Sequence, residues 1–327
     1  MKAYLYPARS KNMFLELNKI ALKKLGFSVE KIEMSFIYEL PRFNNERIVV
    51  LNWVEDRVYD RGVKRFLQAF VSHALLIAYS KLFAKQVIWI RHNFRPHAGS
   101  KNNRRYKLLC HLYRWLNIAP VPLEEYFSSP SLVHPLYRTD QAIQDDISHS
   151  TLNDRELNIP VLFFGAVKKY KNLDKTLDTW PISVPLKIAG YCDDSRYRDL
   201  LETKILKRGL SVEWINRFLS SEELDELLKR TMYVLLPHAE NTMISSGSFY
   251  HAIGEGCNIL TNSSQFGQFK QLQHEFVTLY DGNTITLDSL TKNYKPRTKV
   301  MAEALDFYGE NKVVDAWQNI LTCRGDA

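Results

Sequence analysis

The segment Ser245-Ser246-Gly247-Ser248 stands at the predicted start of a helix, and its residue types suit a phosphate group. An apolar run at 232–236 and a polar loop precede it, and the helical pattern that follows ends at a glycine. The first N–H groups of a helix lack partners within the helix, and the helix dipole favours an anion there. Serine is also a frequent N-cap without any ligand, and taken alone the segment is explained by that role.

Three lysines follow another buried strand. The apolar run at 161–164 ends at Gly165, and Lys168, Lys169 and Lys171 then lead into a helix. Their ammonium groups could meet a diphosphate, although lysine is also common in solvent-exposed loops of this kind. The carboxyl ends of parallel strands lie at one edge of a sheet. The lysines and the serine segment are therefore predicted to converge on one anionic ligand.

His92 is the candidate for proton transfer in the first half of the chain. It follows the apolar run at 86–91, and an imidazole can take a proton from a hydroxyl near neutral pH. The alternative is a histidine that fixes its own loop through hydrogen bonds. Asn52, Trp53 and Glu55 occupy the matching place after the preceding strand, where they offer a carboxylate and an aromatic face.

The elements that must position these residues alternate between strands and helices. Apolar runs at 2–6, 47–53 and 86–91 are separated by amphipathic stretches, and the alternation restarts at 161–164. This order predicts an α/β protein with two doubly wound, Rossmann-like parallel sheets that bind ligands in the cleft between them. We expect one domain at 1–150 and a second at 151–327, with the polar stretch 138–158 as linker and a last helix able to pack on the first domain. The missing G-x-G-x-x-G motif argues against a nicotinamide cofactor.

Composition narrows the classes of partner. The 327 residues carry a net charge of +8 and include four widely spaced cysteines. Their spacing fits no zinc site, and Asp193-Asp194 is predicted as a helix cap, so neither a metal nor a cofactor is expected. The positive charge permits a nucleic acid, a membrane surface or a phosphorylated small molecule. Since Lys and Arg are not interleaved with aromatics in a nucleic-acid motif, no nucleic acid partner is expected.

Two helical segments bear on membranes. Residues 66–87 are the most apolar part of the chain, but they include polar and charged residues and are predicted to form a buried helix. Residues 101–115 form a basic helix, which either lies on an anionic membrane surface or is a solvated outer helix. The first residues lack the long apolar stretch of an export signal, so we expect the protein in the cytoplasm. A peripheral position on the inner face of the plasma membrane is compatible with this location.

In this order and spacing, the motifs resemble those of the GT-B glycosyltransferases over most of the chain. His92-Asn93 with Pro96-His97 is similar to an HN-x-x-PH motif of the bacterial exopolysaccharide and O-antigen transferases, which include the mannosyltransferase of xanthan assembly. Phe164-Gly165 with Tyr170-Lys171-Asn172 is similar to their FG-x4-YKN motif, and the Asn52-Trp53-Val54-Glu55 run resembles an HWPE-like element.

The resemblance implies a transferase that moves a sugar from GDP-mannose or a UDP-sugar to a lipid-linked saccharide in bacterial surface polysaccharide synthesis, without a metal. His92 would be the catalytic base. The residues implied for donor binding are Lys168, Lys171, Asn216, Phe218, Ser245, Ser246, Gly247, Ser248 and His251. Those implied for acceptor binding are Asn52, Trp53, Glu55, Asn93 and His97.

The chain departs from the family pattern at several positions. Met243 and His251 stand where many members have a pair of glutamates, with Glu240 or Glu255 as imperfect substitutes, and Ala166 replaces an arginine. The loss of the glutamate pair favours an inverting reaction. Two alternatives stay open: a nucleotide-sugar epimerase of the same fold, and a basic nucleic-acid-binding protein without catalysis.

Overall fold

The computed structural model describes residues 1–7, 12–32, 46–54, 62–93, 104–149, 157–238, 244–282 and 285–323. The chain forms two compact units. The first unit comprises residues 1–135, 242–245 and 310–327, and the second comprises residues 136–241 and 246–309. Each unit is therefore built from segments that are distant in sequence.

The first unit is a parallel sheet with the strand order β2-β1-β3-β4-β5. Its strands and helices are β1 (Lys2–Tyr6), α1 (Met13–Lys24), β2 (Ser28–Lys31), β3 (Arg47–Asn52), α4 (Val63–Phe83), β4 (Gln86–Arg91), α5 (Arg104–Trp115), β5 (Pro120–Pro122) and α14 (Glu310–Cys323). The register pairs Asn52 with Ile90, so β3 and β4 end side by side. This pairing brings the loops that follow them to one edge of the sheet.

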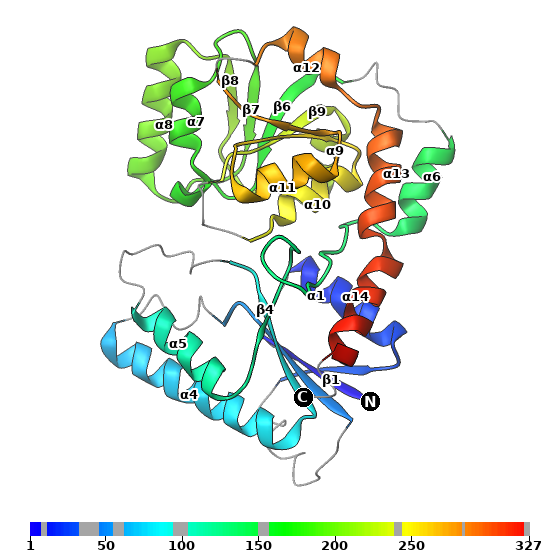
Figure 1. The fold of residues 1–327 in the computed structure, drawn as a ribbon. Coiled ribbons are helices and arrows are strands. Elements are labelled where there is room, and N and C mark those ends of the chain that lie inside the picture. Colours follow the sequence, from blue (N-terminus) through cyan, green and yellow to red (C-terminus); the bar gives the residue numbers. More distant parts are fainter. Residues whose placement is uncertain are drawn as a thin grey trace. The chain divides into compact units, whose positions relative to one another are not determined.

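Helices cover both faces of this sheet. Helices α1 and α14 pack on one face, where the indole Nε1 of Trp317 donates a hydrogen bond of 2.8 Å to Oδ1 of Asn18. Helices α4 and α5 lie next to each other on the opposite face (Figure 1). Residues such as Val49 and Trp89 of the central strands are buried beneath α4 and α5. Strands covered on both faces explain the continuous apolar runs in the sequence.

The second unit is also a parallel sheet, with the order β11-β10-β9-β6-β7-β8. Its first elements are α6 (Asp140–His149), β6 (Ile159–Phe164), the 3-10 turn η2 (Lys169–Lys171), α7 (Leu173–Thr179), β7 (Leu186–Ala189), α8 (Ser195–Arg208) and β8 (Val212–Ile215). The remaining elements are α9 (Ser221–Lys229), β9 (Thr231–Leu236), α10 (Gly247–Gly254), β10 (Asn258–Thr261), α11 (Gln265–Gln273), β11 (Val277–Leu279), α12 (Leu287–Asn293) and α13 (Arg297–Tyr308). The fold class predicted from the sequence is confirmed.

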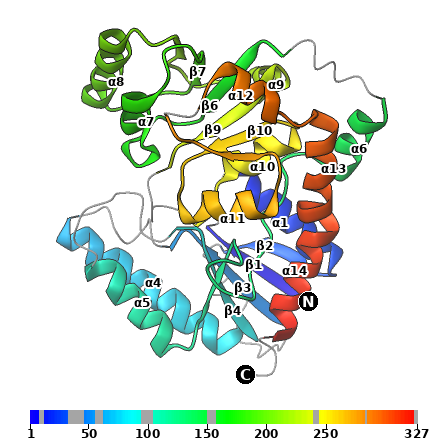
Figure 2. The same ribbon diagram turned by 45° about the horizontal axis from the view of Figure 1, so that its top comes forward.

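Helices α7, α8 and α12 share one apolar core on the sheet of the second unit. Helix α10 packs against β9 and β10, and α13 packs on α10 (Figure 2). Gly165 and Gly190 allow two strand ends to approach closely, since a Cβ atom at position 190 would lie 2.0 Å from the carbonyl oxygen of Gly165. Gly165 also has a φ of +92°, which favours glycine.

Two sequence interpretations are corrected. The stretch 138–158, predicted as a linker, contains helix α6, which packs on α13 within the second unit. Residues 66–87, predicted as a buried helix, correspond mainly to α4, whose outward side chains such as Leu67 and Leu75 are exposed. The polar composition of 138–158 and the apolar composition of 66–87 suggested an exposed linker and a buried helix. Composition alone does not indicate which surfaces the neighbouring elements cover.

Candidate functional site

Lys171 is a buried cation at the carboxyl end of β6. Asn172, which follows it, has a left-handed backbone (φ 60°), and a Cβ atom at Gly165 would lie 3.2 Å from the Lys171 Nζ. The Nζ also lies 5.1 Å from the centroid of the Phe163 ring. Burial lowers the pKa of Lys171 to about 8. Among the residues that the structure describes, no carboxylate pairs with this ammonium group, which suits it to an anionic ligand.

The other two lysines of this loop are engaged with acidic side chains. Lys168 forms an ion pair of 2.5 Å with Asp193, and Lys169 forms one of 3.0 Å with Asp194. The hydrogen bond from Lys168 lowers the pKa of the Asp193 carboxyl. Asp194 also caps α8 by accepting a hydrogen bond of 3.1 Å from the backbone N–H of Tyr197, which confirms its predicted role as a helix cap. Lys168 would have to leave Asp193 to reach a ligand.

The loops after β6 and β9 meet within the second unit. These strands are paired neighbours, and the rings of Tyr170 and His238 stack with centroids 6.5 Å apart. The chain continues from His238 towards α10, whose N-cap is the buried Ser246. The side chain of Ser246 makes no capping hydrogen bond, and Gly247 and Ser248 are half-buried. The first turn of α10 is therefore not capped by its own serine.

Ser245 belongs to the first unit, whereas Ser246 belongs to the second unit and begins its second segment. The hydroxyl of Ser245 donates a hydrogen bond of 2.6 Å to Oε1 of Glu124, and both side chains are buried. The preceding residue, Ile244, donates its N–H to the carbonyl oxygen of His92 at 3.2 Å and accepts a hydrogen bond of 2.7 Å from the Tyr126 hydroxyl. The predicted serine group is thus divided between the two units. Ser245 contacts Glu124 after β5, and Ile244 contacts His92 after β4 and Tyr126 after β5.

His251 lies in α10 and packs against aromatic rings of the second unit. Its ring stacks on Tyr137 with centroids 5.1 Å apart and meets the edge of Phe164 at 5.6 Å. Its Nε2 lies 3.2 Å from Oδ1 of Asp225. Burial lowers the pKa of His251, and Asp225 opposes this effect. The imidazole is consequently neutral near pH 7 and donates from Nε2 to the carboxylate.

An exposed aromatic pair stands at the carboxyl ends of β7 and β8. Phe218 is 77% exposed, and its ring centroid lies 5.0 Å from that of Tyr191. Asn216, which was also predicted to bind the donor, accepts a hydrogen bond of 2.9 Å from the Cys192 backbone N–H through its Oδ1. Asn216 therefore fixes the loop after β7, while Phe218 and Tyr191 present a surface on which a planar group can stack.

His92 is held in a buried polar and aromatic cluster of the first unit. Its Nε2 lies 3.1 Å from Oδ1 of Asn52, whose amide Nδ2 donates to the Tyr6 carbonyl oxygen at 3.2 Å. The indole of Trp53 stacks on His92 with centroids 4.4 Å apart, and the ring of Phe14 packs edge-on at 4.9 Å. Because Asn52 Oδ1 is an acceptor, it selects the tautomer that carries the proton on Nε2, so Nδ1 is the basic nitrogen.

The other predicted acceptor residues are only partly described. Asn93 is buried, and its carbonyl oxygen accepts a hydrogen bond of 3.3 Å from the Nε of Arg91. Glu55 and His97 lie outside the described residues, as does Met243. Three residues of the strand ends, Asn52, Trp53 and His92, are brought together as the sequence order of the strands predicts.

The comparisons with known proteins concern the fold. No protein-family model matches the sequence, and no curated protein sequence matches it. Solved structures do match over the whole chain. AviGT4, a glycosyltransferase involved in avilamycin A biosynthesis, superimposes with a TM-score of 0.61 at 13% identity, covering 100% of this chain and 98% of its own.

Two further structures are similar at the same level. HepE from Anabaena, in complex with UDP and glucose, has a TM-score of 0.63 at 11% identity, covering 99% of this chain and 100% of its own. A trehalose-6-phosphate protein from E. coli bound with UDP-2-fluoro glucose has a TM-score of 0.61 at 8% identity, covering 100% and 99%. The chain has the GT-B fold. At these identities the likeness concerns the fold alone, and the specific resemblance to the xanthan mannosyltransferase stays a prediction.

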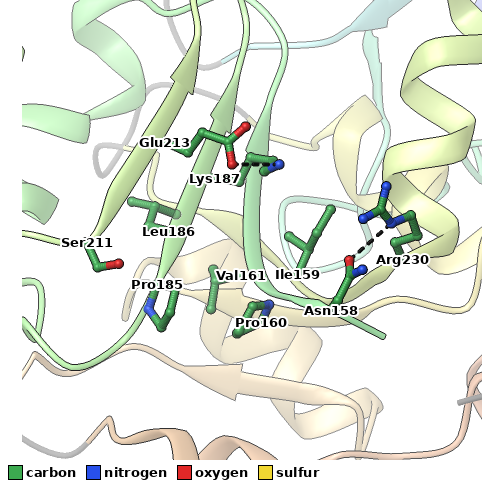
Figure 3. A pocket seen from close by; sticks show the side chains of 10 residues that line it. All are labelled: Asn158, Ile159, Pro160, Val161, Pro185, Leu186, Lys187, Ser211, Glu213 and Arg230. Carbon is green, nitrogen blue, oxygen red and sulfur yellow. Dashed lines mark hydrogen bonds and ion pairs between the residues drawn. The ribbon is translucent and has the colours of Figure 1, made fainter. Parts of the chain in front are cut away.

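A hollow of about 390 Å³ lies elsewhere in the second unit of this GT-B chain (Figure 3). Its lining residues lie at the amino ends of β6, β7 and β8. This is the edge of the sheet opposite to Lys171. Lys187 is paired with Glu213 at 2.8 Å, and Nε of Arg230 donates to Oδ1 of Asn158 at 3.1 Å. Since ligands of doubly wound sheets bind at the carboxyl ends, we place no donor in this hollow.

Three residues that contact predicted site residues were not singled out from the sequence. They are Glu124, Asp225 and Tyr191, which contact Ser245, His251 and Phe218 respectively. Tyr191 had a usable signal, because it directly follows the glycine at the end of β7. Glu124 and Asp225 had none, because their partners are 121 and 26 residues away along the chain.

Proposed function

We propose that the protein is a glycosyltransferase that uses a nucleotide-sugar donor. The observation that carries this proposal is Lys171, a buried ammonium group at the carboxyl end of β6 whose described surroundings hold no paired carboxylate. A diphosphate would supply the missing negative charge. The loop of Lys171 contacts the loop that leads to α10 through Tyr170 and His238, so the N–H groups at Ser246, Gly247 and Ser248 can share the same anion.

The proposed reaction is a single displacement with inversion. The acceptor hydroxyl loses its proton to Nδ1 of His92, and its oxygen forms a bond to the anomeric carbon. The bond between that carbon and the donor phosphate oxygen breaks, and the nucleoside diphosphate leaves with the electron pair. Lys171 and the start of α10 stabilise the charge on the leaving group, so no metal and no cofactor takes part. Asn52 orients the imidazole and stabilises the charged form it acquires.

The same arrangement supports assignments for the residues that bind the donor base and sugar. Phe218 and Tyr191 offer an exposed stacking surface for the nucleobase, and Asn216 holds their loop. We assign to His251, which Asp225 supports, a contact with the ribose or sugar hydroxyls in place of a glutamate. Two similar structures hold UDP with glucose or UDP-2-fluoro glucose, so UDP-glucose is the first donor to test, and GDP-mannose the second.

We further propose a lipid-linked saccharide as acceptor, in the synthesis of a bacterial surface polysaccharide. Asn52, Trp53 and Asn93, with Glu55 and His97, would bind it in the first unit. Helix α5 supports a location on the inner face of the plasma membrane, because Arg104, Lys107 and Arg114 are exposed on it. Such a place would bring the enzyme to an acceptor that is itself embedded in lipid.

A screen of UDP, GDP, CMP and their sugars by thermal shift tests the donor, because a ligand that binds the native state raises the melting temperature. Release of nucleoside diphosphate that depends on added acceptor then tests transfer. The His92→Ala variant should bind donor but lose turnover. Conversion of the donor alone into its epimer would identify an epimerase instead, and a flat screen with all three nucleotide classes would contradict the proposal.

A further inference from the structure

The outward face of α4 is apolar along its length. Val63, Leu67, Val71 and Leu75 follow at intervals of four residues and are 68%, 53%, 53% and 66% exposed, and Leu82 continues the stripe at 68%. A spacing of four places side chains above one another on a helix. Soluble proteins seldom leave so long an apolar stripe in water unless it contacts a partner or lipid.

Helix α4 is long and apolar enough to cross a membrane by length and composition. Its other face, however, belongs to the core of the first unit, where Phe66 and Ile77 are buried. The buried His73 places its Nε2 2.7 Å from the Tyr113 hydroxyl of α5. A helix that spans the bilayer would lose these contacts with the sheet and with α5. In the folded unit, α4 can therefore only lie along a membrane surface.

Helix α5 extends the same outer surface. It lies beside α4 in both ribbon views (Figures 1 and 2), and the guanidinium of its Arg105 stands 4.6 Å from the Phe66 ring centroid. Leu108 and Trp115 of α5 are 46% and 81% exposed. Tryptophan favours the boundary between water and lipid, because its ring is largely apolar while its N–H stays hydrated.

The charges of the two helices favour lipids with anionic headgroups. Neither α4 nor α5 contains an aspartate or a glutamate. Their exposed cations are Lys64, Arg65, Lys81, Arg104, Lys107 and Arg114. The charged side chains that α4 and α5 themselves expose beside the apolar stripe are all cations, which makes this surface complementary to an anionic headgroup layer. Each basic residue near such a layer contributes about 1 kcal/mol. A second copy of the same surface would instead bring like charges together.

We propose that α4 and α5 form a docking surface for an anionic lipid bilayer, with the stripe from Val63 to Leu75 entering the headgroup region. This proposal assigns the apolar part of membrane contact to α4, in addition to the basic α5. It does not depend on sugar transfer, because docking requires neither donor nor acceptor.

Sedimentation of the full chain with vesicles tests the surface. Vesicles of phosphatidylcholine alone are compared with vesicles that also contain phosphatidylglycerol, in the absence of donor. The wild type should bind the anionic vesicles, and the double variant Leu67→Glu/Leu75→Glu should bind them at least about tenfold more weakly. The matched control is Leu206→Glu/Leu272→Glu, whose leucines are 80% and 87% exposed in the second unit and whose charge change is the same.

The proposal is overturned if the wild type does not bind anionic vesicles, or if the two double variants bind them equally. It is also overturned if the wild type is a dimer in sedimentation equilibrium and the α4 variant is a monomer, because a second copy then covers the stripe. Melting temperatures of both variants close to that of the wild type establish that α4 remains folded. Activity on a soluble acceptor reports separately on the transferase proposal.

Discussion

Nε2 of His92 lies 3.1 Å from Oδ1 of Asn52, across the carboxyl ends of two paired strands. The amide oxygen can accept a hydrogen bond but carries no full charge. It therefore fixes the tautomer of His92 and favours the protonated ring less than a carboxylate would. This relationship allows the proposed base to be tested without removing it.

The Asn52→Asp variant should raise the pKa of His92, because a carboxylate beside the imidazole stabilises its protonated form. A general base works only when unprotonated, so the acidic limb of the pH profile of kcat/KM should move upward by about one pH unit. The profile is measured at saturating acceptor with UDP-glucose. The control is Asn319→Asp, an equal change of charge at an exposed position of α14, which should leave the limb in place. An unmoved limb in Asn52→Asp would argue against His92 as the base.

Replacing Lys171 by methionine should weaken donor binding by about tenfold or more, because the donor diphosphate loses a buried cationic partner. Isothermal titration with UDP measures the effect. Lys175→Met removes the same charge from an exposed position four residues away and should change the affinity little. Equal affinities in the two variants would remove Lys171 from the donor site.

The same substitution should stabilise the protein without ligand. Burial lowers the pKa of Lys171 to about 8, below its value in the unfolded chain, so the folded state binds fewer protons between these two values. The stability of the wild type relative to the Lys171→Met variant should therefore rise with pH above about 8. At pH 7 the Lys171→Met variant should be more stable by on the order of 1–3 kcal/mol, and the difference should shrink as pH rises. Denaturant unfolding at pH 7 and at pH 9.5, about one unit below the reference lysine pKa, checks both statements. A difference that grows with pH would contradict them.

Phe218→Ala should reduce the affinity for UDP by about five- to tenfold, since a stacking contact contributes about 1 kcal/mol or slightly more. Inorganic pyrophosphate provides the control ligand, because it has the phosphates without the base. Its affinity should be unchanged in this variant. A parallel loss for both ligands would mean that Phe218 supports the fold of the loop rather than the base.

Ser245→Ala should lower the free energy of unfolding by about 1–3 kcal/mol, because the buried carboxylate of Glu124 loses a hydrogen-bond donor. Donor affinity should stay within about twofold, since this hydroxyl is directed at Glu124 rather than at a ligand. Chemical denaturation and isothermal titration with UDP separate the two effects. A large loss of donor affinity with unchanged stability would instead support the predicted role of Ser245 in donor binding.

Much of the fold followed from local patterns. The alternation of apolar runs with amphipathic stretches predicted the strands and the two parallel sheets, because buried parallel strands are apolar on both faces. Parallel strands also end at a common edge, so the neighbouring positions of Asn52 and His92 could be predicted. A local sequence pattern also predicted a helix cap, since Asp194 caps the start of α8.

The sequence by itself determined which side chains follow strand ends and which share a helix face. Only the tertiary structure decided which of those faces are covered and which polar groups find partners. Lys168 and Lys171 are three residues apart in the same loop, yet one is paired with Asp193 and the other is buried without a described carboxylate. Helix α4 is apolar on two faces, and periodicity does not indicate which face meets the sheet. Burial and pairing depend on residues far away in the chain, which local spacing does not encode.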